Sequence, residues 1–377
     1  MFCIGVCTLK KRLYRSFIKK SCILAPMMKL INVTNLYFMR KQLLSFAVAL
    51  FATGAMAQSV PTHEMYVNSG TPTDIVTALD KWEPGKPWNG DVNFVDENFW
   101  ISRVPLKDRF RPGDQANDAL NDENNKKFCW MAPTGEMTKK WGALPRYNFD
   151  GDNFNMWQYV DIHSNWTNGF WRVPGAFNDV AHKNGVKTGC TYFIDWGAQV
   201  TSTSAAGKTL WDLSAKASNS YGDTFKYSRK LVQFLKYYGI DGLCFNPEGT
   251  WEYMLNNRFK EFLAECHKIA DELNWPFHVD WYAYVSDQGQ LSDNGCKLDD
   301  ANDTWFHDTK SGQPVTDVFF LNYNWSENGL QTSANKAKAL GRSTFDVYAG
   351  FDMQGRGYGR NGNAGWSALM RQPVRPR

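Results

Sequence analysis

Seven apolar segments of strand length recur along the chain, separated by amphipathic runs. The segments cover residues 127–132, 156–166, 186–196, 240–248, 276–285, 317–325 and 346–355. The runs between them, such as 175–185, 228–238 and 257–273, repeat apolar residues at helical spacing. Buried strands that alternate with amphipathic helices are typical of a parallel sheet covered by helices. With seven such units, the pattern predicts an α/β fold of the TIM (β/α)8-barrel type.

A complete barrel needs an eighth strand, and the pattern shows none after residue 355. The chain continues through a Gly-rich stretch and stops in the letters RQPVRPR. We therefore expect an incomplete barrel with seven readable strands, shortened by truncation or by a change of reading frame near Met370. A natural permutation, or a helper strand from the segment before the barrel, are the alternatives.

The same pattern divides the chain into three parts. Residues 1–57 form a basic leader, residues 58–126 an N-terminal arm and residues 127–377 the barrel domain. The arm is polar and irregular, with a helix predicted at 71–82 and a strand at 99–106. No Ser-, Pro- or Gly-rich linker separates it from the barrel, so we expect the arm to pack on that domain.

The leader has the pattern of a secretory signal. From Met39 it has a basic start, an apolar core over residues 43–52 and a small-x-small exit that ends at Ala57. Residues 1–38 are interpreted as an over-long start or an unusual basic region. The pattern predicts cleavage after Ala57 and export to the periplasm, the cell surface or the medium. No later stretch approaches about 20 apolar residues, so no transmembrane segment is expected.

Removing the leader changes the charge balance. The whole chain has a formal net charge of +4, but the leader holds nine Lys or Arg and no acidic residue, so 33 basic residues face 38 acidic ones in the remainder. No basic patch interleaved with aromatics is present there, so nucleic acid is not an expected partner. The charge pattern instead favours a neutral substrate.

Cysteines and histidines give no sign of a metal site or a cofactor. The five cysteines after Met39 are Cys129, Cys190, Cys244, Cys266 and Cys296, an odd set without C-x-x-C spacing. Two of them lie inside apolar segments and are interpreted as small buried hydrophobes, with a reactive thiol as the alternative. The histidines are single and lack ligand spacing. We therefore predict no metal and no organic cofactor.

The candidate chemistry lies at the end of the fourth apolar segment, in the letters IDGLCFNPE. Asn246 and Glu248 are two residues apart, so on an extended strand their side chains point to the same side. The preceding helix and the turn at Gly239 place them at the carboxyl end of a parallel strand, where α/β folds build active sites. A solvated loop carboxylate and a turn asparagine before Pro247 are the alternatives. Asp241, earlier on this strand, is interpreted as a structural hydrogen-bonding residue.

One glutamate beside an amide favours a particular kind of glycoside hydrolysis. Most glycosidases use two carboxylates, whereas here the 2-acetamido carbonyl of the sugar would act as the nucleophile and form an oxazoline. Glu248 would protonate the leaving oxygen and then deprotonate water.

These residues stand in a chain that resembles the catalytic domain of glycoside hydrolase family 85, the endo-β-N-acetylglucosaminidases that cut the chitobiose core of N-glycans. The resemblance runs from about Asp74 to Arg356. Its motifs, in the order of the family, are TALDKW, RVPLK, WQYVDIHSNW, VPGAFNDVAHKNGVKTGCTYFIDW, YGIDGLCFNPE, WYAYVSDQG, VFFLNYNW and DVYAGFDMQGRG. It implies hydrolysis of the β-1,4 bond between the two core GlcNAc residues of N-glycans or glycoproteins.

The resemblance also implies roles for two residues beside the glutamate. Asn246 would hydrogen-bond the acetamido group, and Tyr282 aligns with a tyrosine that assists near the acid/base, with a packed core tyrosine as the alternative. Aromatic side chains at strand ends can stack on sugars. The predicted substrate-binding residues are Trp196, Trp281, Asn322, Tyr323 and Trp325.

Two motifs depart from the family. The first-strand C-H-D-M motif has Trp130 in place of histidine, and the W-Y-D-S motif is Trp281-Tyr282-Ala283-Tyr284. An altered or narrower glycan specificity could follow. A glycan-binding pseudoenzyme, or an inactive fragment of such an enzyme, is therefore the alternative function.

Overall fold

The computed structural model describes most of the predicted barrel and part of the arm. The described residues are 62–64, 73–84, 100–109, 129–132, 140–142, 156–165, 173–217, 219–290 and 295–351. The predicted leader and the predicted loss of a strand near Met370 both lie outside them. The three-part division of the chain stays a prediction.

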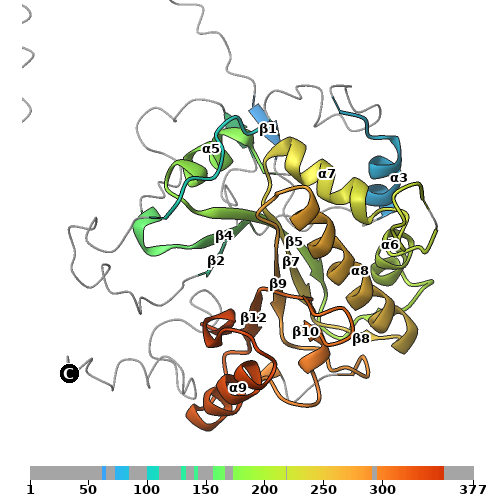
Figure 1. Ribbon diagram of the computed structural model, residues 1–377, viewed down its shortest axis with the longest axis vertical. Helices are drawn as coiled ribbons and strands as arrows, with labels where there is room; N and C mark the ends of the chain where they lie inside the picture. The colour runs from blue at the N-terminus through green and yellow to red at the C-terminus, as the bar shows by residue number, and fades with distance from the viewer. Residues whose placement is uncertain are drawn as a thin grey trace, which may run out of the picture. The chain divides into compact units, whose positions relative to one another are not determined.

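A seven-stranded parallel sheet is the centre of the fold (Figure 1). In sheet order the strands are β13 (Val347–Ala349), β12 (Val318–Leu321), β9 (His278–Tyr282), β7 (Gly242–Pro247), β5 (Lys187–Ile194), β4 (Ile162–Asn165) and β2 (Cys129–Ala132). Every neighbouring pair is parallel. Each of the seven predicted strands is therefore confirmed. The second is shorter than expected, because residues 157–159 form a 3-10 turn, η5 (Trp157–Tyr159), before the strand begins.

The sheet curls into a half-barrel. Ser164 on β4 donates a hydrogen bond to Asp280 on β9, although β5 and β7 lie between these two strands in the sheet. Cys129 on β2 also lies within 3.8 Å of the Asp280 carboxylate. Contacts between side chains three and four strands apart require a concave inner face. The predicted incomplete TIM barrel is confirmed in this form.

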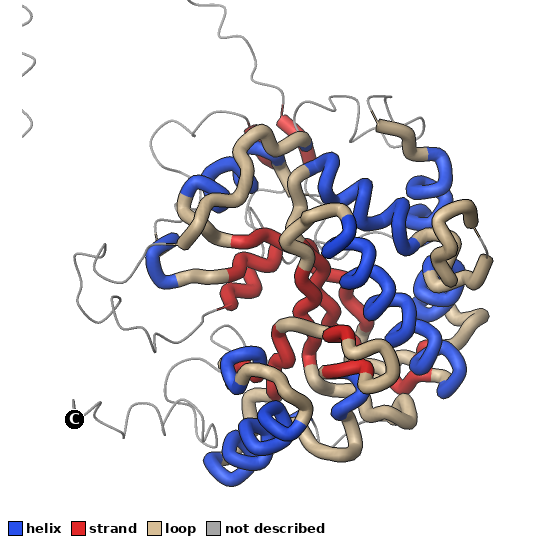
Figure 2. The backbone as a smooth tube through the Cα atoms, in the orientation of Figure 1, coloured by secondary structure: helices blue, strands red, loops and turns tan. Residues whose placement is uncertain are grey.

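Helices cover the outer face of the curled sheet (Figure 2). They are α5 (Gly175–Lys183), α6 (Ala205–Leu213), α7 (Ser228–Tyr238), α8 (Tyr253–Glu272) and α9 (Glu327–Ala339). The end of α7 shows how the sequence sets the geometry. Gly239 adopts φ 73°, a left-handed conformation that glycine reaches without strain, and its N–H bonds to the carbonyls of Leu235 and Lys236. The chain then turns directly into β7, as predicted.

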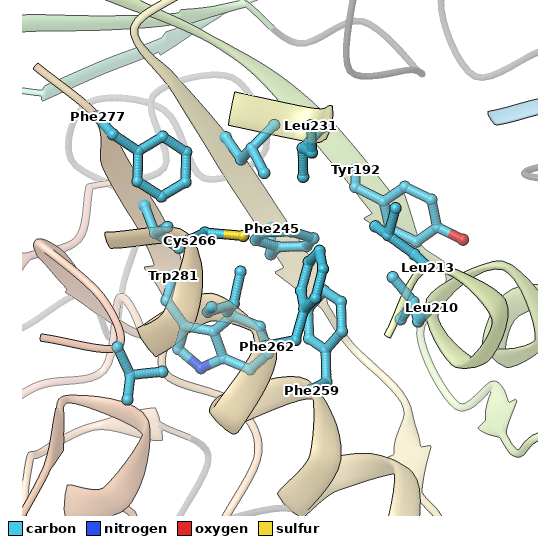
Figure 3. Packing of buried hydrophobic residues seen from close by; sticks show 14 of the residues in the cluster. Tyr192, Leu210, Leu213, Leu231, Phe245, Phe259, Phe262, Cys266, Phe277 and Trp281 are labelled. Carbon is cyan, nitrogen blue, oxygen red and sulfur yellow. The ribbon is translucent and has the colours of Figure 1, made fainter. Parts of the chain in front are cut away.

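The core lies between the sheet and the helices α7 and α8 (Figure 3). Alternation along β7 sends Phe245 outward, where its ring packs edge-on against Phe259 of α8 at 5.4 Å. Trp281 on β9 joins the same cluster and stacks on Trp305 with a centroid distance of 3.8 Å. The odd-numbered residues of both strands therefore belong to the core, and the even-numbered ones face the inside of the half-barrel.

Short strand pairs and 3-10 turns complete the described fold. The pairs are β1 (Thr62–Glu64) with β3 (Lys140–Gly142), β6 (Gln199–Val200) with β8 (Thr250–Trp251), and β10 (His307–Asp308) with β11 (Gln313–Pro314). The remaining 3-10 turns are η7 (Asp303–Trp305) and η8 (Thr344–Asp346). Among the helices that the structure describes, none is both long and apolar enough to cross a membrane.

Part of the arm packs on the barrel. Helix α3 (Thr73–Lys81) lies beside α6 and α7, and the ring of Trp82 meets Phe234 edge-on at 5.2 Å. Farther along, one oxygen of Asp179 on α5 accepts hydrogen bonds from the backbone N–H groups of Arg103 and Val104 at 2.7 and 3.0 Å. The arm is thus held by both apolar and polar contacts.

A buried ion pair lies beneath this junction. His182 on α5 bonds to the Val104 carbonyl at 2.6 Å and to the Asp241 carboxylate at 2.9 Å. Both partners are acceptors, so the doubly protonated imidazolium satisfies them together. Burial lowers the pKa of His182, but the bond and the charge of Asp241 outweigh it and leave that pKa raised. The same carboxylate accepts the Thr188 N–H at 2.7 Å, which confirms Asp241 as a structural residue.

Candidate active site

The end of β7 brings the predicted amide and carboxyl together. Asn246 is the last residue but one of β7, and Glu248 directly follows the strand. Asn246 Nδ2 donates a hydrogen bond to Glu248 Oε2 at 3.0 Å. Asn246 is buried, whereas Glu248 keeps part of its surface in contact with solvent. The two side chains share one site, as their spacing predicted, while their roles in catalysis stay predictions.

Backbone contacts hold Glu248 against the loop that follows β5. The Gly197 N–H donates to the Glu248 carbonyl at 2.8 Å, and the Thr250 N–H donates to the Ala198 carbonyl at 2.8 Å. A Cβ at Gly249 would lie 2.6 Å from the Ala198 carbonyl oxygen, so only glycine fits this close approach. The pairing of β6 with β8 extends the junction. Glu248 is therefore positioned by two adjacent loops of the sheet.

The surroundings of Glu248 favour its protonated form. Partial burial raises the pKa of this carboxyl above its ordinary value. The hydrogen bond from Asn246 opposes the rise in pKa, and the negative charge of Asp195 adds to it. A carboxyl with a raised pKa, partly open to solvent, is suited to donate a proton and take it back.

Tyr282 ends β9, the next strand of the sheet, and is held in one orientation. Asn322, just after β12, donates from Nδ2 to the Tyr282 hydroxyl at 2.7 Å. The side-chain Oδ1 of Asn322 accepts the Asn324 N–H at 3.2 Å, which fixes the orientation of the Asn322 side-chain amide. Burial, then the neighbouring Tyr323 and Glu248, raise the pKa of Tyr282. The phenol is thus neutral and can donate its own proton to an acceptor in the site.

The predicted sugar-stacking aromatics fall into two groups. Trp196 is 73% exposed and follows β5, and Tyr323 is half-buried with its ring stacked on that of Tyr282 at 6.1 Å. Both lie at the carboxyl ends of strands. Trp281 and Trp325 do not belong with them.

The assignments of Trp281 and Trp325 to substrate binding are corrected by their burial. Trp281 is 0% exposed and lies in the core in Figure 3, because the strand directs its neighbours Asp280 and Tyr282 inward and Trp281 outward. Trp325 is 4% exposed and donates its indole N–H to the Gly350 carbonyl at 3.0 Å. Neither ring has a free face for a sugar.

Sequence reasoning missed two residues of the site. Asp195, one residue beyond β5, acts on Glu248 through its charge. Tyr284, two residues after the end of β9, accepts a hydrogen bond from the Trp196 indole N–H at 3.1 Å. Both could have been found in the sequence, because each is a residue with a polar group that comes just after a buried strand. The same signal had drawn attention to Asn246.

No metal centre is found in the part of the chain that the structure describes, where no group of three or more His, Cys, Asp or Glu could hold an ion. Within the described residues, the five cysteines after Met39 form no disulfide. Burial raises the pKa of Cys190 and Cys244 well above the ordinary value, so these thiols are inert and behave as small hydrophobes.

A family model described as glycosyl hydrolase family 85 matches residues 136–372 of the chain. Among curated proteins, the cytosolic endo-beta-N-acetylglucosaminidase of Gallus gallus is 27% identical over 313 residues, which is 80% of this chain and 38% of the relative. That of Danio rerio is 28% identical over 207 residues, covering 54% of this chain and 26% of the relative. The chain thus spans well under half the length of these relatives.

Solved structures give the same fold. The glycoside hydrolase domain of Endo-D from Streptococcus pneumoniae R6 superposes with a TM-score of 0.59 at 25% identity. The match covers 73% of this chain and 40% of that one. A score of this size over most of the chain supports the reading of the sheet as part of a barrel.

The predicted export is wrong in the light of these relatives. The curated proteins matched from Danio rerio, Arabidopsis thaliana, Gallus gallus, Mus musculus and Homo sapiens are all named as cytosolic enzymes. A basic start followed by a short apolar run is a pattern of composition, which N-terminal segments can carry without directing export. The prediction of a periplasmic, surface or secreted protein is therefore withdrawn.

Proposed function

We propose that this chain, which belongs to glycosyl hydrolase family 85, hydrolyses the β-1,4 bond between the two core GlcNAc residues of N-glycans. The observation that carries the proposal is the hydrogen-bonded pair of Asn246 and Glu248 at the carboxyl end of β7. One carboxyl beside an amide suits substrate-assisted, retaining hydrolysis better than a mechanism with two carboxylates. The relatives' names support the same reaction class.

The pair divides the chemistry between its two members. With Nδ2 engaged by Glu248, Oδ1 is the Asn246 atom that can accept the acetamido N–H of the sugar. This bond orients the acetamido carbonyl toward the anomeric carbon and stabilises the positive charge that develops on the group. Glu248 protonates the glycosidic oxygen while the carbonyl oxygen attacks, and the C–O bond breaks to leave an oxazolinium ion.

In the second half of the reaction, Glu248 takes up a proton instead of donating one. The Glu248 carboxylate takes a proton from water, the water oxygen adds to the anomeric carbon, and the oxazoline ring opens to regenerate the acetamide. Retention at the anomeric carbon follows from two successive displacements. Tyr282 would donate a hydrogen bond during ring closure. The bond that its hydroxyl accepts from Asn322 supports this role, because it leaves the phenolic proton available to another acceptor.

The test is to incubate the chain with a high-mannose glycoprotein and to determine by mass spectrometry what remains on the asparagine. Cleavage between the two core sugars leaves a single GlcNAc there. Glu248→Gln removes the transferable proton and should lower hydrolysis about 10²–10⁴-fold. Glu261→Gln is the matched control, because Glu261 forms an exposed pair with Lys216 on the surface.

Circular dichroism of both variants checks that the fold is intact. Near-normal turnover by Glu248→Gln would show that another group transfers the proton. Glycan binding by the unaltered chain without any cleavage would favour the glycan-binding alternative.

A further inference from the structure

The most exposed large aromatic residue at the candidate site is held in place by a buried one. Trp196 is 73% exposed, yet its indole N–H donates a hydrogen bond to the Tyr284 hydroxyl at 3.1 Å. Tyr284 is 6% exposed, and its ring stacks on Tyr282 with a centroid distance of 5.5 Å and an interplanar angle of 21°. A solvent-facing indole is thereby anchored to the inner wall of the half-barrel.

The strand order places this contact beside the candidate acid. Trp196 follows β5 and Tyr284 follows β9, and β7 lies between these strands in the sheet. A bond between the two side chains must therefore cross the carboxyl end of β7, where Glu248 lies. The neighbour of Trp196, Gly197, donates its N–H to the Glu248 carbonyl at 2.8 Å.

We propose that Tyr284 is a positioning residue that holds the Trp196 indole as a stacking platform for a GlcNAc ring beside the scissile bond. The inference rests on the proposed function and names one contact of that site with its substrate. An aromatic face suits the apolar C–H face of a pyranose. An indole fixed before binding loses less side-chain freedom when the sugar arrives, so the contact contributes more to affinity.

This role affects binding rather than the chemical step. Tyr284 contacts Trp196 through its hydroxyl and Tyr282 through its ring, so in the proposed role it acts on the sugar only through Trp196. Removal of its hydroxyl should weaken the platform in the ground state and in the transition state alike. A loss of uniform binding raises KM and leaves kcat unchanged.

The experiment is a double-mutant cycle with Tyr284→Phe, Trp196→Phe and the combination of both. Binding of the disaccharide N,N′-diacetylchitobiose is measured by calorimetry, and KM and kcat are measured with a high-mannose glycopeptide. Tyr284→Phe should weaken disaccharide binding and raise KM about three- to tenfold, the range expected for one hydrogen bond. The kcat should stay within about twofold of the unaltered chain. Tyr221→Phe, at a 70% exposed tyrosine, is the matched control.

Non-additivity distinguishes positioning from a separate contact. If Tyr284 acts through Trp196, Tyr284→Phe should have little further effect once Trp196→Phe is present. Additive losses, unchanged affinity in Tyr284→Phe, or no disaccharide binding by the unaltered chain would each overturn the inference. Tyr284-dependent binding without any cleavage would refute the proposed activity and leave the platform standing.

Discussion

Asn246→Ala tests the proposed chemistry most directly, because it removes the orienting amide without removing the acid. A well-oriented intramolecular attack can lower a barrier by about 7–11 kcal/mol, and a misplacement of about 1 Å can cost about 10²-fold in rate. Since Nδ2 already fixes this amide on Glu248 at 3.0 Å, its loss frees the acetamido group to rotate. We expect kcat on an intact glycan to fall by about 10²-fold or more.

A preformed sugar oxazoline separates this effect from general damage. That donor has already passed the ring closure that Asn246 assists, so Asn246→Ala should use it within about tenfold of the unaltered chain. The variant should also show a shifted pH profile. The hydrogen bond from Asn246 lowers the pKa of Glu248, so its loss raises that pKa and moves the alkaline limb of activity to higher pH.

The assay compares rates with a high-mannose glycopeptide and with the oxazoline donor across a range of pH. Asn178→Ala is the matched control, since both amide atoms of Asn178 on α5 are buried and have no hydrogen-bond partner among the residues that the structure describes. This control should behave as the unaltered chain with both donors. Equal loss of both activities in Asn246→Ala would mean that the asparagine is purely structural, and the substrate-assisted scheme would fail.

Three further predictions concern the acid, the core and the arm. Asp195→Asn removes a charge that raises the pKa of Glu248, so the alkaline limb of kcat/KM should move to lower pH; an unmoved limb would argue against this coupling. Trp281→Ala should lower the free energy of unfolding by about 3–5 kcal/mol in urea titrations while KM of the folded fraction is unchanged, whereas a raised KM would restore Trp281 to the site. The raised pKa of His182 stabilises the fold fully below about pH 6.5, its unfolded value, so urea midpoints should fall as pH rises through the folded-state pKa. His182→Gln should flatten that dependence, and an equal slope in both proteins would exclude His182 as its source.

The sequence predicted the strands well because each one is a short apolar run bounded by turn residues. The order of strands along the chain is also their order across the sheet, since right-handed crossovers place each new parallel strand beside the last. Gly239 was recognisable because a left-handed turn after an amphipathic helix strongly favours glycine. The pair Asn246 and Glu248 needed only the alternation of side chains along one strand.

The side of a strand to which each side chain points was harder to predict where both faces of the strand are apolar. The run that contains Trp281 and Tyr282 is aromatic on both faces, so periodicity could not tell the core side from the site side. The structure resolves it through Asp280, whose carboxylate meets Ser164 inside the half-barrel and fixes which residues point inward. Tyr284 was not predicted because its role depends on Trp196, 88 residues earlier in the chain.

The central position of the site in the sheet explains why its side chains are held in fixed positions. Its side chains come from the ends of β5, β7, β9 and β12, four strands that are adjacent in the sheet, and β7 has three strands on each side of it. Within the described residues, the Asn246–Glu248 pair and the Asn322–Tyr282 bond each join atoms on these inner strands or their loops. Neither bond draws on β2, at one edge of the sheet. Backbone hydrogen bonds also join the loops after β5 and β7 to each other. Glu248, the candidate acid, is therefore held by central strands of the sheet and their loops. Under the proposed function, a substrate would meet a preorganised carboxyl and amide, and the aromatic rings of Trp196 and Tyr323 would decide how firmly each sugar is held.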